Sequence, residues 1–261
     1  MPDSGSWDVI SGAESDQFIL AVDFSFLRHR EAGFVELAAK IGAKYRFLQA
    51  KLPSSPPGSR ASGPAYVGRW IEQIQGRPIA AVLGHRVGSV YATALAEEIS
   101  HWQRAPRLIL FNPQLASAKL IGHELDSQVK AISSLLSDDE LEHTGKLAAK
   151  IAQSPPGDVV HAATAAAEIY WEISSVAYDR VGIGGAYCRQ SFGSFNSYMS
   201  LVSAAHEIDS SQAWKRSTTI VSSPVDDGCG VVGHSIPFDV SHADLLRSDS
   251  VAKKVLELLD F

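Results

Sequence analysis

Short apolar runs alternate along residues 17–114 with segments in which apolar side chains recur every three or four positions. An uninterrupted apolar run is typical of a strand buried on both faces of a parallel sheet, and the longer spacing is typical of a helix that covers it. The predicted strands lie within Phe18–Phe24, Tyr45–Ala50, Ala80–Leu83 and Leu108–Phe111, and the predicted helices within Phe34–Ile41, Tyr66–Ile74 and Val87–Leu95. This order predicts an α/β fold with a mostly parallel central sheet and helices on both faces.

Helical spacing dominates residues 115–214, and no strand of convincing length interrupts it. The predicted helices span about 125–136, 138–152, 159–176 and 192–206. The sequence Ser-Asp-Asp-Glu at 137–140 is a favourable helix start, and Ser154–Gly157 breaks the pattern. We expect this region to be a helical lid that is inserted into the α/β core.

The chain is expected to return to the sheet after the helical region. Thr218–Ser223 and Ile236–Val240 predict two further strands, and Val251–Leu259 has the spacing of a C-terminal helix. The first 16 residues are polar and contain Gly and Ser, which predicts a flexible tail. The predicted organisation is therefore a tail at 1–16, a core formed by 17–114 and 215–261, and a lid insertion at 115–214.

One stretch between a predicted strand and a predicted helix has the spacing of a sharp turn. Gly84-His85-Arg86-Val87-Gly88 places glycines two residues before and two residues after Arg86. In hydrolases, the pattern G-x-S-x-G at such a turn presents a serine nucleophile at the turn's tip. Because the tip residue is strained and has little room beside it, the two glycines indicate that this elbow geometry is present.

Arg86 stands at the tip of this elbow and cannot act as a nucleophile. Its guanidinium stays protonated and has no acceptor atom, so the serine–histidine acyl-enzyme mechanism is excluded at this position. Two interpretations remain open. Arg86 at a helix N-terminus would bind a carboxylate, a phosphate or an oxyanion, or it would pair internally with Asp226 or Asp227 and fill an inactive pocket.

Composition narrows the class of protein further. The net charge is −6, and no basic block interleaved with aromatic residues is present, which disfavours nucleic-acid binding. The two cysteines, Cys188 and Cys229, form no C-x-x-C pair, and the polar start of the chain lacks a signal-peptide pattern. No apolar run approaches the roughly 20 residues of a membrane span. We therefore expect a cytoplasmic protein, and the scattered histidines predict no metal or other cofactor.

The elbow and the order of elements resemble the α/β-hydrolase superfamily, and within it the thioesterases of polyketide and nonribosomal-peptide biosynthesis. The resemblance covers about residues 17–260, and the family's G-H-S-x-G motif matches everywhere except at Arg86. Where the family often has an aspartate after the next strand, this chain has Asn112. Other members carry the acid after a later strand, where Asp226 and Asp227 lie. Ser241–Leu246, before the last helix, resembles the loop of the catalytic histidine.

This resemblance implies the roles of several residues. It identifies His242 as the acid or base, and Asp226 or Asp227 as the carboxylate that orients it. It also places oxyanion or substrate contacts at Val87, at Asn112 and at the Phe24–Ser25 backbone. The implied partner is an acyl or peptidyl small molecule, which a carrier protein would deliver.

Three hypotheses of function follow. The first is a thioesterase-like protein of natural-product biosynthesis that works without a serine, with His242 as acid or base and Arg86 as the anion binder, in a cyclisation, an elimination or another non-hydrolytic rearrangement. The second is an inactive pseudo-thioesterase that binds a carrier protein or a partner enzyme. The third is a hydrolase with another nucleophile, for which Cys229 is the candidate.

Overall fold

The computed structural model describes residues 5–11, 14–24, 31–53, 61–224 and 233–260. They divide into two compact units. The core unit comprises Met1–Lys51, Pro64–Leu115 and Ile208–Phe261, and the helical unit comprises Leu52–Gly63 and Ala116–Glu207. The helical unit therefore ends earlier than the predicted insertion, because residues 208–214 group with the core.

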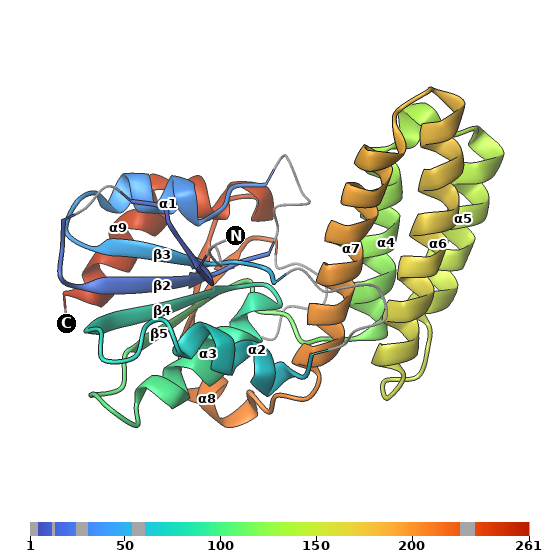
Figure 1. The fold of residues 1–261 in the computed structure, drawn as a ribbon. Coiled ribbons are helices and arrows are strands. Elements are labelled where there is room, and N and C mark those ends of the chain that lie inside the picture. Colours follow the sequence, from blue (N-terminus) through green and yellow to red (C-terminus); the bar gives the residue numbers. More distant parts are fainter. Residues whose placement is uncertain (1–4, 12–13, 25–30, 54–60, 225–232, 261) are drawn as a thin grey trace. The chain divides into compact units, whose positions relative to one another are not determined.

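The core unit is built on a sheet of seven described strands in the order β1-β3-β2-β4-β5-β6-β7 (Figure 1). The strands are β1 (Trp7–Val9), β2 (Phe18–Val22), β3 (Arg46–Ala50), β4 (Ile79–His85), β5 (Arg107–Phe111), β6 (Thr218–Ser222) and β7 (His234–Phe238). Every neighbouring pair is parallel except β1 and β3, which are antiparallel. The predicted mostly parallel sheet is confirmed.

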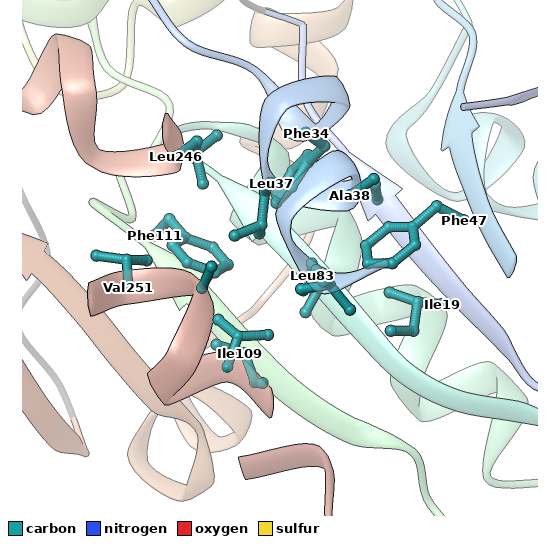
Figure 2. Close-up of a cluster of buried hydrophobic side chains, with 14 of the residues drawn as sticks. Ile19, Phe34, Leu37, Ala38, Phe47, Leu83, Ile109, Phe111, Leu246 and Val251 are labelled. Atoms are coloured by element: carbon teal, nitrogen blue, oxygen red, sulfur yellow. The ribbon is translucent and has the colours of Figure 1, made fainter. Parts of the chain in front are cut away.

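Helices cover both faces of this sheet, as the alternation of elements predicted. The described helices of the core unit are α1 (Phe34–Ile41), α2 (Gly63–Ile71), α3 (Gly88–Ile99), α8 (Ser211–Arg216) and α9 (Asp249–Leu259), with the 3-10 helix η3 (His242–Arg247). On one face, α1, η3 and α9 pack on alternate strand residues such as Ile19, Leu83 and Phe111 (Figure 2). Neighbouring residues of a strand point to opposite faces of the sheet. Because helices cover both faces, the side chains on each face are buried, and the strands are continuous apolar runs in the sequence.

An aromatic cluster packs on the opposite face of the sheet. Trp70 of α2 stacks on Phe24, with ring centroids 5.8 Å apart, and meets the Tyr91 ring of α3 edge-on at 5.4 Å. Tyr66 of α2 contacts both Trp70 and Tyr91. Large aromatic side chains bury much apolar area, so this cluster holds α2 and α3 against each other.

Two elements of the core differ from the sequence prediction. Strand β1 lies inside the expected tail, where Trp7–Val9 pairs with the outer edge of β3 and the Trp7 ring N–H donates to the Trp70 carbonyl, 2.9 Å away. These contacts order a short polar segment that has no apolar run of its own. Helix α8 was not predicted, because its six residues are too few to show a helical period.

The helical unit contains four long helices, drawn in green to orange in Figure 1. They are α4 (Ala118–Ala131), α5 (Asp138–Ala152), α6 (Val159–Arg180) and α7 (Gly185–Ala205), and the short 3-10 helix η2 (Ser133–Leu135) follows α4. Helix α5 has the predicted bounds, whereas α6 runs longer and α7 begins earlier than expected. None of the described helices combines the length and the apolar character that a membrane span requires.

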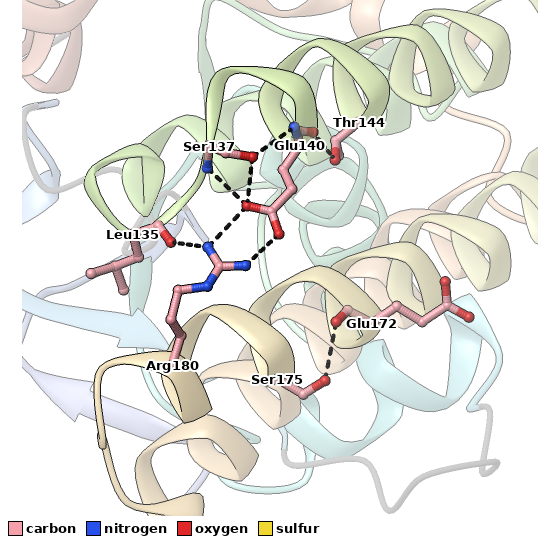
Figure 3. A network of polar contacts seen from close by, with 7 residues as sticks. All are labelled: Leu135, Ser137, Glu140, Thr144, Glu172, Ser175 and Arg180. Carbon is pink, nitrogen blue, oxygen red and sulfur yellow. Dashed lines mark hydrogen bonds and ion pairs between the residues drawn. The ribbon is translucent and has the colours of Figure 1, made fainter.

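A polar network joins the start of α5 to the end of α6 within this unit (Figure 3). Ser137 and Glu140 form a capping box, in which Glu140 accepts the Ser137 backbone N–H at 2.8 Å. Arg180 donates to both carboxylate oxygens of Glu140, at 3.0 and 2.6 Å, and to the Leu135 carbonyl at 3.1 Å. The Arg180 guanidinium, followed by the Ser137 N–H, lowers the pKa of Glu140 to about 2.

This network predicts a loss of stability of the helical unit in acid. Because the pKa of Glu140 is lower in the folded state than in the unfolded chain, its contribution is full at neutral pH and is lost as the pH falls from about 4.5 towards 2. We expect Glu140→Gln to destabilise the unit at pH 7 and to flatten its stability across this range, as followed by helical circular dichroism in urea. Glu172→Gln, on the exposed face of α6, is the matched control, and equal profiles for both variants would contradict the assignment.

Candidate functional site

The predicted elbow is present between β4 and α3. Arg86 follows the last residue of β4 and has φ of 52°, in the left-handed region. Its N–H donates to the Phe111 carbonyl at 3.0 Å, and its carbonyl accepts the N–H groups of Ser89 and Gln114, each at 3.1 Å. Hydrogen bonds on both sides therefore hold the backbone of Arg86 in a conformation that side-chain-bearing residues rarely adopt.

Both glycines of the elbow are required by close packing. A Cβ on Gly88 would lie 2.2 Å from the carbonyl oxygen of Val22 in the neighbouring strand β2. A Cβ on Gly84 would lie 2.6 Å from the Cα of Ser89 and 2.7 Å from the Cβ of Ala92. The glycines therefore allow α3 to start directly against the ends of β2 and β4, as the sequence spacing predicted.

The backbone strain at position 86 should affect the free energy of unfolding of variants at this position. Arg86→Gly and Arg86→Ala both remove the guanidinium, but only glycine adopts a positive φ without a Cβ clash. We expect the glycine variant to be more stable than the alanine variant by about 1 kcal/mol in urea unfolding. At Arg69, which is exposed on helix α2, the same pair of changes should give the opposite order, because alanine favours helix. An alanine variant that matches or exceeds glycine at position 86 would contradict the assigned strain.

The side chain of Arg86 faces a carboxylate that the sequence did not single out. Its Nη1 lies 3.7 Å from Oε2 of Glu31, and both side chains are only 10% exposed. The other oxygen of Glu31, Oε1, lies 3.5 Å from Nε2 of His242, whose side chain is 45% exposed. One carboxylate is thus placed between the elbow arginine and the candidate histidine.

The two segments that carry Glu31 and His242 are joined directly. The N–H of Ala32 donates to the carbonyl of Ala243 at 2.9 Å, so the residues that follow Glu31 and His242 are hydrogen-bonded to each other. His242 is the first residue of η3, and Ser241 caps this helix through the N–H of Asp244. The predicted loop before the last helix is therefore a short 3-10 helix, and its start is fixed beside Glu31.

Asn112 has a structural role at the end of β5. Its φ is 41°, and its side-chain oxygen accepts the Ser222 N–H at 2.9 Å while its amide nitrogen donates to the Ser222 hydroxyl at 3.1 Å. The buried Asn112 side chain thereby joins the ends of β5 and β6. Asparagine tolerates the left-handed region and supplies both a donor and an acceptor, which explains the residue type. Substrate contact by Asn112 stays a prediction.

A buried histidine–aspartate pair lies directly beneath the elbow. His85 Nδ1 is 3.2 Å from Asp23 Oδ1, and the side chains are 2% and 4% exposed. The pair joins the ends of β4 and β2, and the Phe34 ring contacts His85 edge-on. In the sequence, each of the two residues stands at the end of an apolar run. This position could have indicated the pair, because neighbouring parallel strands end at the same edge of the sheet.

Of the remaining predicted site residues, the structure describes only Phe24 and Val87. Phe24 is buried in the aromatic cluster and Val87 is the buried N-cap of α3, so both lie at the carboxyl edge of the sheet. Their oxyanion roles stay predictions. The other candidates lie outside the described residues: Ser25, Asp226, Asp227 and Cys229. Among the described residues, no group of three His, Cys, Asp or Glu side chains is placed to hold a metal ion.

Solved structures provide the comparison for this architecture. No protein-family model matches the sequence, and no curated protein matches it. The Vlm2 thioesterase domain, whose structure holds a dodecadepsipeptide, is 13% identical with a TM-score of 0.51, and 98% of this chain and 96% of that one are covered. The α/β hydrolase MGS-M2, from a Medee basin deep-sea metagenome library, is 14% identical with a TM-score of 0.51, and 97% and 91% are covered.

The chain has an α/β-hydrolase fold. A four-domain nonribosomal peptide synthetase, AB3403, also resembles it with a TM-score of 0.61 at 11% identity, although this chain spans only 20% of that protein's length. In fold, the chain therefore resembles thioesterase domains of nonribosomal-peptide assembly, and α4–α7 form its helical insertion. At these identities, the likeness concerns the fold, and the chemistry has to be argued from the residues.

Proposed function

We propose that this chain is a thioesterase-like protein of natural-product biosynthesis that acts on an acyl or peptidyl substrate without a serine nucleophile. The observation that carries the proposal is the position of the Glu31 carboxylate against Nε2 of His242. In a Ser-His-Asp triad, that ring nitrogen faces the nucleophilic hydroxyl. Here it faces a carboxylate, while arginine stands at the elbow, so the arrangement suits proton transfer and not acyl-enzyme formation.

The proposed roles follow from the contacts of each group. The carboxylate of Glu31, 3.5 Å from Nε2 of His242, favours the proton on that nitrogen, which would leave the lone pair of the imidazole on Nδ1 as the base. Nδ1 would take the proton from a substrate hydroxyl or amine that attacks the acyl carbonyl, and the proton would then pass to the leaving thiolate. A cyclisation of this kind needs no water and no covalent enzyme intermediate.

Arg86 is proposed to act as the fixed positive charge of this site. Its guanidinium faces Oε2 of Glu31 and so holds the carboxylate with its other oxygen towards His242. A substrate carboxylate or an oxyanion would have to share this guanidinium with Glu31. A role for Asp226 or Asp227 beside His242 is retained as part of the proposal, since both precede β7 in the chain.

Synthetic acyl thioesters that carry an internal hydroxyl or amine test this function. Turnover by the native protein, with cyclised and hydrolysed products separated by mass spectrometry, should show cyclisation that depends on His242. A chain that turns over none of these substrates, and whose binding of them is unchanged in His242→Ala, would instead fit the pseudo-thioesterase. The pairing of the largely buried Arg86 with Glu31 favours that second function. A covalent adduct on Cys229 would support the third hypothesis.

A further inference from the structure

Two adjoining cavities lie at the edge of the sheet opposite to the elbow. The first, of about 370 Å³, is lined by residues at the starts of β5 and β6 and by α3 and α8, including Arg107, Thr218 and Arg216. The second, of about 560 Å³, is lined by residues at the starts of β2, β4 and β5, including Ile79, Arg104 and Arg107. Ala105, Pro106 and Arg107 line both cavities, so together they form one groove along the amino-terminal ends of the strands.

This amino-edge groove is built on ordered backbone. The Gln103 side chain accepts the Ile79 N–H at 3.1 Å and donates to the Ile79 carbonyl at 2.6 Å, which fixes the floor of the second cavity against the start of β4. On the side of the first cavity, the Trp214 ring N–H of α8 donates to the Thr93 hydroxyl of α3 at 3.0 Å. Hydrogen bonds therefore join the elements that line each of the two cavities.

The charge of the groove is opposite to that of the chain. Among the described residues that line it, three are exposed arginines, Arg104, Arg107 and Arg216, and one is acidic, Glu97. None of the three guanidiniums forms an ion pair with any residue in the described parts of the chain. Lys51 and Arg180, by contrast, are each paired with a carboxylate. In a chain of net charge −6, three unpaired guanidiniums along one groove form a local positive surface.

The shape of the groove favours a protein segment over other anions. Small-molecule sites enclose most of their ligand, whereas these arginines are exposed and are spread along two cavities. Single-stranded nucleic acid is bound through aromatic stacking, and none of the described residues that line the two cavities is aromatic. Arginine is enriched at protein interfaces, where its planar guanidinium pairs with carboxylates.

We infer that the amino-edge groove binds an acidic segment of a partner protein, with Arg104, Arg107 and Arg216 pairing with its carboxylates. The site is independent of the elbow, because it lies at the opposite ends of the strands. It can be occupied whether or not the elbow carries out chemistry.

A fluorescein-labelled decaglutamate peptide tests this inference by fluorescence anisotropy with the full chain. Binding should weaken steeply as salt rises, because the contacts are exposed ion pairs. Arg107→Glu, at the junction of the two cavities, should reduce affinity at least tenfold, and Arg104→Glu and Arg216→Glu should each reduce it as well. Circular dichroism and urea unfolding identify any of the three arginine variants that is misfolded. The affinities of the remaining variants then test the inference.

Arg69→Glu is the matched control, since it makes the same change of charge at an exposed position of α2 outside both cavities. It should leave binding within about twofold. The inference is overturned if the peptide does not bind at low salt, or if Arg69→Glu weakens binding as much as Arg107→Glu. It is also overturned if a labelled ten-residue oligothymidylate binds as tightly as the peptide, because the groove would then select charge alone.

Discussion

Gly88→Ala is expected to destabilise the core unit by about 3 kcal/mol or more in urea unfolding. The added Cβ would lie 2.2 Å from the carbonyl oxygen of Val22 and 2.8 Å from its carbon. Both are backbone atoms of a strand that is paired with β3 and β4, so no side-chain rotation relieves the overlap. Helix α3 has to move away from the sheet, which opens the aromatic cluster around Tyr91 and Trp70.

Gly68→Ala is the control for this change. Gly68 lies inside helix α2 of the same unit, and a Cβ there has no atom within 4 Å. Because alanine favours helix over glycine by up to about 1 kcal/mol, this variant should be as stable as the native chain or slightly more stable. Equal losses for the two variants would mean that the start of α3 is not held as closely as the structure places it.

His242→Ala and Glu31→Gln should each reduce thioester cyclisation by a factor of about 10² to 10⁴, the usual contribution of general acid–base catalysis. Alanine removes the base. Glutamine keeps the size of Glu31 but loses the charge that faces both Arg86 and His242. The proton on the imidazole is then no longer directed to Nε2. The measurement is the initial rate of cyclisation at saturating substrate, with variants that are shown to be folded.

The matched controls come from an exposed histidine–carboxylate pair elsewhere in the core unit. His101 Nδ1 lies 3.4 Å from Glu98 Oε2, and both side chains are exposed near the end of α3. His101→Ala and Glu98→Gln should leave the rate within about twofold. If Glu31→Gln behaves like Glu98→Gln while His242→Ala is inactive, the histidine acts without the partner assigned to it, and the proposed role of Glu31 is wrong.

Much of the fold followed from local patterns in the sequence. Apolar runs predicted β2, β4, β5 and β6, and the spacing of apolar residues predicted α1 and α5 with the bounds that the structure shows. Strand β1 escaped prediction because its order comes from pairing with β3 and from the Trp7 contact with Trp70. Such contacts depend on tertiary structure, and three mixed residues carry no periodicity of their own.

The candidate site was only partly predictable. Gly84 and Gly88 revealed the elbow because their spacing around residue 86 is visible in the sequence, although the clash that Gly88 avoids is with Val22 of β2. Glu31 could not be distinguished from other acidic residues, since its position depends on the hydrogen bond between Ala32 and Ala243, which lie far apart in the chain. Asn112 was expected at the site for its place after β5, but its side chain bonds with Ser222 of β6. Sequence position alone did not show that partner.

The hydrogen bonds around Arg86 have a consequence for protein engineering. Its N–H and carbonyl are held by backbone atoms of Phe111, Ser89 and Gln114. The conformation of the tip is therefore imposed by the neighbouring backbone and is independent of the side chain it presents. A library that installs new reactive groups at position 86 can leave the turn unaltered. It should vary position 31 at the same time, because the carboxylate there is matched to a guanidinium.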